Sequence, residues 1–453
     1  MANRMLYNLT NTINKHPFAL ALIYSILLRL FLFIFYNSVT IFPDTEDYTS
    51  LALYLQNFSL ENYTGERTPG LPFLIALLGG NLKLTVLIQT IIGLLNVYLV
   101  FDFCKTKTGK INFAFWIAII TTSFLHVVFY ELAILTETLT LFFLFLSFWY
   151  IQKFDILKPN TSIKHYFILS IILSYLYFIR PMFIYVPIGF SIFYLARNFN
   201  FEIKKIIPRI LAILLLPLLC FYSWCSLNEK NIGQFTSSYY LGINLAQVVT
   251  PFFEKAPEED KLIRDIFVKH RIYVEQNLPR TEYPMTAWYA LEELIEKTGL
   301  TRHELMEELG RISKNLIKSH PDLYAKQVFV SWNNFWFTSS ILWNAEKFQN
   351  KYIKTVFVGI WNYIQSYLLI LINLLFVIFS FKKLFQFFKS KCSVYDLDLL
   401  IVAIVLSGSL AQALVVFDSS NSRFSFPFFP LIVYFVLVNV MTLKNNYAKR
   451  TLP

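Results

Sequence analysis

The stretch at residues 17–42 is PFALALIYSILLRLFLFIFYNSVTIF, and its one charged residue is Arg29. An α-helix rises about 1.5 Å per residue and needs about 20 apolar residues to cross the hydrocarbon of a bilayer. Because a bilayer offers no water to backbone groups, such a block must be helical. The block is too long for a removable signal peptide and lacks a small-residue cleavage site. We therefore predict that it spans a membrane.

Blocks of the same kind recur along the chain of 453 residues, which is 56% hydrophobic and only 15% charged. Soluble proteins carry about 25% charged residues. Continuous apolar runs also differ from the alternating strands of a membrane barrel. We predict an all-α polytopic membrane protein with about ten spans, near residues 17–42, 83–103, 111–130, 134–151, 166–180, 181–197, 210–226, 353–380, 396–416 and 424–443.

The formal charge of +11 comes mainly from lysines and arginines in every second loop between the predicted spans. Lys105, Lys107 and Lys110, which follow the second span, are an example. Such alternation marks the cytoplasmic side and favours contact with anionic lipid, so we expect no nucleic-acid partner. Both termini are predicted to be cytoplasmic.

The same topology predicts three parts. Residues 1–226 form a transmembrane module whose first outer loop is 43–82, residues 227–352 form a mostly helical extracytoplasmic domain, and residues 353–453 form the last transmembrane helices. A capping box, Thr301 with Glu304, predicts a helix start in the domain. The apolar run 71–78 is too short to span and predicts an interfacial or re-entrant helix. Aromatic residues then lead back to the membrane as an interfacial belt: Trp332, Phe335, Trp336 and Trp343.

An acidic cluster, Pro43-Asp44-Thr45-Glu46-Asp47-Tyr48, lies just beyond the first span. Three carboxylates in four positions repel one another unless a cation is near. One interpretation is therefore a functional site. The other is a solvated acidic loop that caps a helix starting near Tyr48.

Three arginines, Arg67, Arg180 and Arg423, are predicted on the same outer side, where the positive-inside rule disfavours them. A guanidinium can bind a phosphate with two hydrogen bonds. Each arginine alone is also explained by its side chain reaching the headgroups. Because all three share a side with the acidic cluster, we favour a common site for an anionic ligand.

Two further charges, Arg29 and Glu137, fall within predicted spans, where a charge costs about 2.5–3.5 kcal/mol on insertion scales. They are expected to face protein or a cavity, paired with each other or with other polar groups. His126 is interpreted as a satisfied polar group near the outer interface. The four cysteines have no metal-site spacing and imply no disulfide framework.

Taken in order, these landmarks resemble the GT-C glycosyltransferases, a superfamily that includes protein mannosyltransferases and the aminoarabinose transferases of lipid A. The acidic motif after the first span, Pro43-Asp44-Thr45-x-Asp47-Tyr48, resembles their first outer loop. The other landmarks follow in the family's order: Arg67-Thr68-Pro69-Gly70-Leu71-Pro72, Thr136-Glu137, Arg180-Pro181, Trp224-x-x-x-Asn228, Gly242-Ile243-Asn244-Leu245, His320-Pro321-Asp322-Leu323-Tyr324 and Arg423-Phe424. Two features depart from the family pattern. Thr45 stands where many members have Glu, and the chain has fewer spans than many members, which indicates a smaller bacterial branch.

The resemblance implies an integral-membrane glycosyltransferase, of hexosyl or pentosyl type, that uses a polyprenyl-phosphate sugar. The sugar would pass by inverting direct displacement to a glycan, lipid or protein acceptor on the extracytoplasmic face. It implies Asp44 as the base, with Asp47 or Glu46 orienting the acceptor or tuning Asp44. Arg67, Arg180 and Arg423 would bind the donor phosphate, and Glu137 and Tyr48 would line the cavity. No metal or other cofactor is required, although three carboxylates could bind a divalent ion.

Two other classes of function stay open at this point. A transporter or lipid flippase would also hold charges within spans, but it more often shows inverted repeats. A polysaccharide polymerase or ligase would place functional arginines in its large late loop. Richness in Lys, Asn, Ile and Phe is typical of AT-rich bacterial genomes, so the expected location is a bacterial inner membrane.

Overall fold

A computed structural model describes residues 15–36, 39–417 and 423–451. These residues are nearly all helical, and the only extended pairing among them consists of two isolated β-bridges, Tyr36 with Phe348 and Thr40 with Ala133. The termini at 1–14 and 452–453, and residues 37–38 of the first predicted span, lie outside the described residues.

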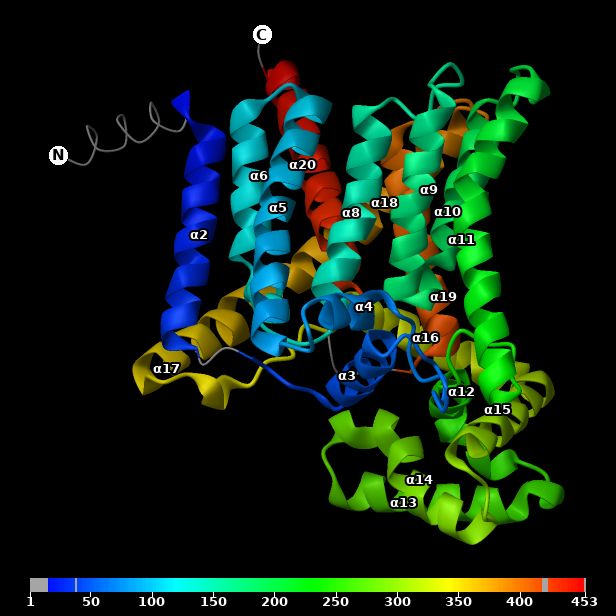
Figure 1. The fold of residues 1–453 in the computed structure, drawn as a ribbon. Coiled ribbons are helices and arrows are strands. Elements are labelled where there is room, and N and C mark those ends of the chain that lie inside the picture. The colour runs from blue at the N-terminus through cyan, green and yellow to red at the C-terminus, as the bar shows by residue number, and fades with distance from the viewer. Residues whose placement is uncertain (1–14, 37–38, 418–422, 452–453) are drawn as a thin grey trace.

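Long helices stand side by side as one bundle (Figure 1). These helices are α2 (Pro17–Phe35), α5 (Leu82–Thr108), α6 (Ile111–Ser123), α8 (Glu137–Lys153), α9 (Ile163–Ile179), α10 (Tyr185–Arg197), α11 (Ile203–Ile232), α18 (Ser366–Lys389), α19 (Leu397–Val415) and α20 (Phe429–Thr451).

In the described part of the chain, six helices are long and apolar enough to cross a membrane, or seven if the bent pair α6 and α7 (Leu125–Glu131) is one span. The outer face of α2 exposes large apolar side chains at helical spacing: Ile23, Leu27, Leu30 and Ile34, each at least 52% exposed. In water such a patch would be costly, whereas lipid solvates it. The chain is therefore an integral membrane protein, and the full count of ten spans stays a prediction.

Several predicted spans differ from the observed helices. The span predicted at 210–226 is longer, as α11, and three others differ in shape. The helix of the first span ends at Phe35, because Tyr36 turns into extended backbone and pairs with Phe348. The predicted span at 111–130 is bent by 62° between α6 and α7. The predicted span at 353–380 extends over 351–389 as α17 (Lys351–Ile360), a π-helical turn (Trp361–Gln365) and α18. At about 1.5 Å per residue this helix exceeds the hydrocarbon thickness, consistent with its oblique course behind the bundle in Figure 1.

Short elements gather at the end of the bundle that faces α12–α15. They are α3 (Pro43–Gln56), α4 (Gly70–Leu77) and the 3₁₀ turn η1 (Pro181–Ile184). The short helix predicted at 71–78 is confirmed as α4. The interpretation of the acidic cluster as a loop before a helix near Tyr48 is wrong, because Pro43 already occupies the first turn of α3.

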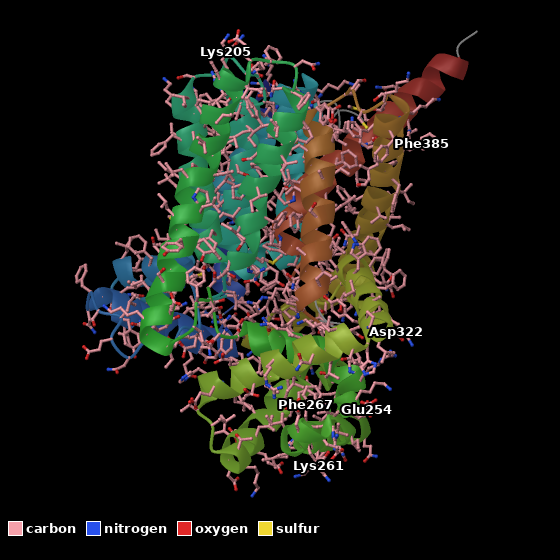
Figure 2. All side chains as sticks on the ribbon, turned by 90° about the vertical axis from the view of Figure 1, so that its right-hand side faces the viewer. Lys205, Glu254, Lys261, Phe267, Asp322 and Phe385 are labelled. Carbon is pink, nitrogen blue, oxygen red and sulfur yellow. The ribbon has the colours of Figure 1, made fainter. Side chains whose placement is uncertain are left out.

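A second, smaller helical unit lies beyond this end and has its own buried core. We call it the outer unit because it lies outside the helix bundle. It comprises α12 (Leu241–Val249), η2 (Thr250–Lys255), η3 (Glu258–Asp260), α13 (Lys261–Asn277), η4 (Arg280–Met285), α14 (Thr286–Thr298) and α15 (Arg302–Ser319). The predicted capping box is confirmed, with the Thr301 N–H donating to Glu304 at 2.8 Å. Figure 2 places Lys261 of this unit and Lys205 at opposite ends of the molecule.

The chain returns to the bundle through α16 (Pro321–Phe337) and η5 (Ala345–Lys347). Trp336 is fully buried and stacks on Phe376 of α18 at 5.5 Å. Trp332 donates to the Ser409 hydroxyl of α19 at 3.0 Å. The predicted interfacial belt is therefore wrong for Phe335 and Trp336, which pack inside the protein.

Candidate active site

The acidic cluster is built into the first turn of α3. Phe42 is extended, as the residue before a proline usually is, and Pro43 opens the helix. One turn separates Asp44 from Asp47, so both carboxylates lie on one face. Between them, the buried Thr45 hydroxyl accepts the Phe42 N–H at 3.0 Å and donates to the Ile134 carbonyl at 3.2 Å. Thr45 thus attaches α3 to the segment that leads to α8.

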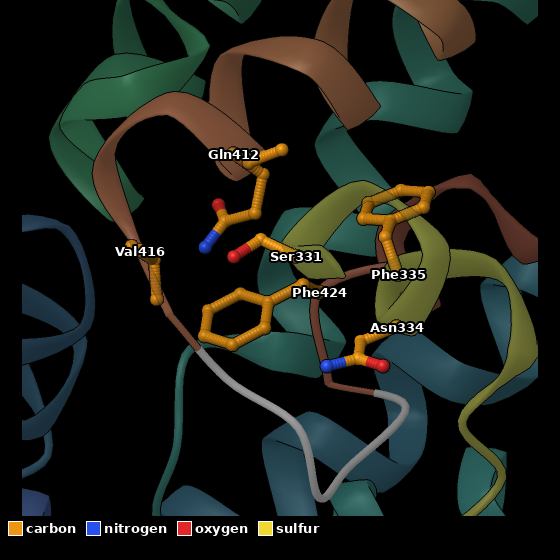
Figure 3. A pocket seen from close by; sticks show the side chains of 7 residues that line it. Ser331, Asn334, Phe335, Gln412, Val416 and Phe424 are labelled. Atoms are coloured by element: carbon orange, nitrogen blue, oxygen red, sulfur yellow. The ribbon is translucent and has the colours of Figure 1, made fainter. Parts of the chain in front are cut away.

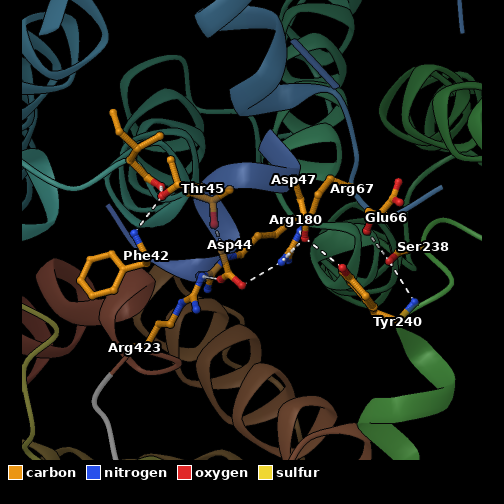
Figure 4. Close-up of polar contacts among 12 residues, drawn as sticks. Phe42, Asp44, Thr45, Asp47, Glu66, Arg67, Arg180, Ser238, Tyr240 and Arg423 are labelled. Atoms are coloured by element: carbon orange, nitrogen blue, oxygen red, sulfur yellow. Dashed lines mark hydrogen bonds and ion pairs between the residues drawn. The ribbon is translucent and has the colours of Figure 1, made fainter. Parts of the chain in front are cut away.

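Arg67 lies between these two aspartates (Figure 4). Its guanidinium is 2.8 Å from Asp44 and 2.9 Å from Asp47. The rings of Tyr48 and Tyr240 each lie 5.0 Å from the guanidinium carbon, within cation–π range. The backbone of Arg67 is also fixed, because the Tyr63 hydroxyl contacts both its N–H and its carbonyl at 2.6 Å.

A second group of charges forms around Glu137 at the first turn of α8, where the helix dipole favours an anion. Glu137 is fully buried, and its Oε1 contacts both Arg180 and Arg423. Arg180 also donates to the Thr136 hydroxyl at 2.8 Å. Arg180 lies just after the last residue of α9. The following Pro181 disfavours a helical conformation for Arg180, so the helix ends and Arg180 is extended.

Arg423 joins the two groups. Its Nη2 lies 2.8 Å from Asp44 Oδ2, while its Nε contacts Glu137. Burial would raise the pKa of the Asp44 carboxyl, but Arg423 and Arg67 outweigh it and hold that pKa well below its usual range. The ion pairs thus run in one chain: Asp47, Arg67, Asp44, Arg423, Glu137 and Arg180.

The structure therefore brings together seven of the eight predicted site residues, with the Tyr48 ring against Arg67. The exception is Glu46, which is exposed on α3. The roles assigned to these residues stay predictions.

The two charges predicted within spans do not pair with each other. Arg29 instead binds Glu131 with two hydrogen bonds, of 2.8 and 2.5 Å, and both side chains are buried. Gly93 makes room for this pair, because a Cβ there would lie 2.0 Å from Glu131 Oε1. Gln89 donates to the carbonyls of Glu131 and Ala133 at 2.9 and 2.8 Å. The bonds from Arg29 and Gln89 thus fix the position of the segment 131–133, which precedes Glu137.

Sequence reasoning missed Glu131, Gln89 and Tyr240. A carboxylate within an apolar run was the signal for Glu131, by the argument already applied to Arg29. No pattern marked Tyr240, which comes from the outer unit and donates to Asp47 at 3.0 Å. Beside it, the Ser238 hydroxyl donates to the Glu66 carbonyl at 2.6 Å (Figure 4). The outer unit thus contacts the site directly.

Two cavities lie in the part of the molecule around the site. One, of about 10 Å³, lies between α16, α19 and Phe424 (Figure 3). It meets the buried Ser331 Oγ and Gln412 Nε2, which have no hydrogen-bond partner among the described residues. Its volume suits about one water molecule. Another, of about 350 Å³, lies between the 233–242 segment and α15. The described residues contain no group of three or more His, Cys, Asp or Glu placed to hold a metal ion.

Comparison with known proteins gives only distant likeness. No family model and no curated protein matches the sequence. One similar solved structure is the archaeal oligosaccharyltransferase AglB from Archaeoglobus fulgidus in complex with an inhibitory peptide and a dolichol-phosphate. It has a TM-score of 0.49 and 10% identity, over 97% of this chain and 52% of that one. Another is an Archaeoglobus fulgidus oligosaccharyltransferase tethered to an acceptor peptide, with a TM-score of 0.34 and 13% identity, over 80% and 55% of the two chains. The chain thus spans about half the length of these proteins.

Proposed function

We propose that this chain is a GT-C-type integral-membrane glycosyltransferase that moves a sugar from a polyprenyl-phosphate donor to an acceptor. The observation that carries the proposal is the chain of ion pairs from Asp47 to Arg180. It gathers residues from α3, the loop before α4, α8, the end of α9 and the turn that precedes the 3₁₀ turn η7 (Phe426–Phe428). These are the residues that the family resemblance selects from the sequence.

The chemistry needs few groups. A phosphate leaves an anomeric carbon without protonation when cations stabilise its growing charge. Arg180 and Arg423 are the proposed phosphate ligands, since both contact Glu137 at the bundle end. Arg67 is enclosed by two aspartates and two aromatic rings. We therefore propose that it orients Asp44 in addition to contributing positive charge near the phosphate.

One carboxylate then serves as general base for the acceptor hydroxyl. Asp44 is the proposed base, because it lies between Arg423, a proposed phosphate ligand, and Arg67. Asp47 would orient the acceptor together with Tyr240. Attack from the face opposite the phosphate inverts the anomeric centre.

The site would lie on the extracytoplasmic side of a bacterial inner membrane. Lys205, in the basic first turn of α11, lies at the end opposite the outer unit, as the positive-inside rule requires for such an arrangement. The donor would then be a sugar on undecaprenyl phosphate, and the acceptor a glycan, lipid or protein of the envelope.

The test is sugar transfer in membranes that hold the protein, supplied with radiolabelled polyprenyl-phosphate sugars. Label should reach an acceptor with the wild type and not with Asp44→Asn, which keeps the shape of the side chain but cannot take a proton. Folding of the variant is checked by its melting temperature in detergent. Transfer that survives this substitution would move the base to Asp47, and movement of lipid across the bilayer without transfer would favour a flippase.

A further inference from the structure

The three site arginines differ in how readily an anionic ligand could replace one of their present partners. Arg67 binds two aspartates, lies between two rings and has its backbone held by Tyr63. Arg180 binds Glu137 and Thr136. In its contacts with the described carboxylates, Arg423 instead divides its guanidinium, with Nε on Glu137 and Nη2 on Asp44. It can therefore give up one carboxylate and keep the other.

Among the residues that the structure describes, the charges of the ion-pair chain balance before a ligand arrives. The three guanidinium charges of Arg67, Arg180 and Arg423 equal the three carboxylate charges of Asp44, Asp47 and Glu137. A phosphodiester donor adds one negative charge. It must compete with one of these carboxylates for an arginine, since uncompensated charge in a partly buried site is costly.

We propose that the donor phosphate takes the Nη2 edge of Arg423 from Asp44, and that this exchange frees Asp44 to act as the base. The inference rests on the proposed function. Arg423 keeps Glu137 through Nε, so Glu137 acts as a positioning residue that presents the freed edge. Donor binding then precedes activation of the acceptor hydroxyl.

The exchange has an electrostatic consequence for Asp44. With two guanidinium partners it is a weak base, and losing one while a phosphate arrives strengthens it. The other groups near Asp44 stay in place: Arg67 from the loop, Glu46, Asp47 and Tyr48 on α3, Glu137 on α8 with Arg180, and Tyr240 through Asp47.

The transfer step balances. The acceptor oxygen forms a bond to the anomeric carbon while the bond from that carbon to the phosphate oxygen breaks, and its electron pair leaves with the phosphate. The acceptor proton passes to Asp44. The phosphate charge grows from one to two as Asp44 becomes neutral, so the net charge of the site does not change. Arg180 and Arg423 therefore act most strongly on the transition state.

The experiment measures the protonation of Asp44 directly in the purified full chain in detergent. A hydrophobic carbodiimide modifies protonated carboxyl groups, and peptide mass spectrometry locates the modified residue. Modification of Asp44 is followed against pH with and without decaprenyl phosphate as the probe. We expect the midpoint for Asp44 to rise by about one pH unit with the probe, the effect of losing one nearby cation. Decaprenol, which lacks the phosphate, should leave it unchanged.

Two variants sharpen the test. Arg423→Gln should raise the midpoint without the probe and remove most of the probe's effect. Arg311→Gln breaks the remote ion pair with the buried Asp260 in the outer unit and should leave the midpoint of Asp44 unchanged. A midpoint that stays or falls with saturating probe overturns the inference, and wild-type protein alone decides this if Arg423→Gln does not fold. Sugar transfer is measured separately, so transfer without a midpoint change rejects the exchange and keeps the proposed function.

Discussion

At the scale of single residues, the site is a set of charges that are partly buried, with Glu137 fully buried. Each carboxylate both holds an arginine in place and competes with an anionic ligand for it. Buried ion pairs contribute little net stability, whereas removing one partner leaves a charge that costs about 3–5 kcal/mol. Asp44 and Glu137 therefore fix the arginines before any ligand binds. The strength of these carboxylate–arginine contacts also decides how easily an anionic ligand can replace a carboxylate.

Glu137→Gln tests this balance. The amide keeps the shape but removes the charge that Arg180 and Arg423 share. Decaprenyl phosphate should bind more tightly, by roughly tenfold or about 1.4 kcal/mol, because two cations lose a competing anion. The turnover number should fall by at least about tenfold as the arginines lose their orientation. Titration calorimetry and steady-state transfer rates measure the two effects, and weaker binding of the probe would assign Glu137 to folding only.

Tyr240→Phe tests the contribution of the outer unit. The change removes the hydroxyl that donates to Asp47 but keeps the ring over Arg67. A hydrogen bond to a charged group is worth about 1.5–3 kcal/mol, so transfer should slow by about tenfold or more. The matched control is Tyr289→Phe, because the Tyr289 hydroxyl also donates to a carboxylate, that of Glu282 at 2.9 Å, but is exposed and should be almost neutral for transfer. Equal effects of the two changes on initial transfer rates would show that Tyr240 has no particular role.

At the scale of elements, close backbone contacts decide where the segments that carry the candidate site lie. The first turn of α4 packs on the end of α9, where the Tyr175 hydroxyl donates to the Gly70 carbonyl at 2.9 Å. A Cβ at Gly70 would lie 2.5 Å from the Ile179 backbone nitrogen, so only glycine fits. This contact brings the Arg67 loop toward Arg180.

Gly70→Ala should therefore lower both stability and transfer. The clash is with backbone, which cannot move aside as a side chain can, so we expect a loss of about 1–3 kcal/mol. Gly359→Ala in α17 is the control, because its nearest atom beyond its own helix backbone lies 4.0 Å away and alanine favours helix. Thermal unfolding in detergent compares the two, and equal melting temperatures would refute the packing argument.

The sequence predicts elements well where one physical cause dominates. Long apolar runs gave helices such as α5 and α19 within a few residues of their observed bounds. The start of α3 has a local signal, Pro43 at the first helical position, which the prediction did not use. The bend after Ser123 was not predictable, because it depends on a distant residue, Gln365, which bonds the Ser123 carbonyl and the Leu125 N–H. Likewise, the site residues were identified from their charges, but their pairing was not. Arg29 offered two interpretations, and only the fold shows that its partner is Glu131.

At the scale of the whole molecule, the orientation of the chain in the membrane determines which substrates can reach the site. α2 begins and α20 ends at one end of the bundle, and the outer unit lies at the other (Figure 1). Lys205 and Lys261 mark these two ends in Figure 2. If the end with Lys205 is cytoplasmic, the ion-pair chain faces the outside, and the proposed lipid-linked donor would have to cross the membrane before it is used.

Cysteine accessibility tests this orientation with a native probe. Cys392 is exposed in the loop between α18 and α19, which is predicted to be cytoplasmic, whereas Cys104 and Cys225 are buried. A membrane-impermeant maleimide should modify Cys392 in inverted vesicles but not in intact spheroplasts. In a Cys392→Ser background, Lys261→Cys should show the opposite pattern, since Lys261 is in the outer unit. Detergent-solubilised protein gives full labelling as the control. The reversed result at both positions would place the ion-pair chain on the cytoplasmic side, and the donor would then have to be used before it crosses the membrane.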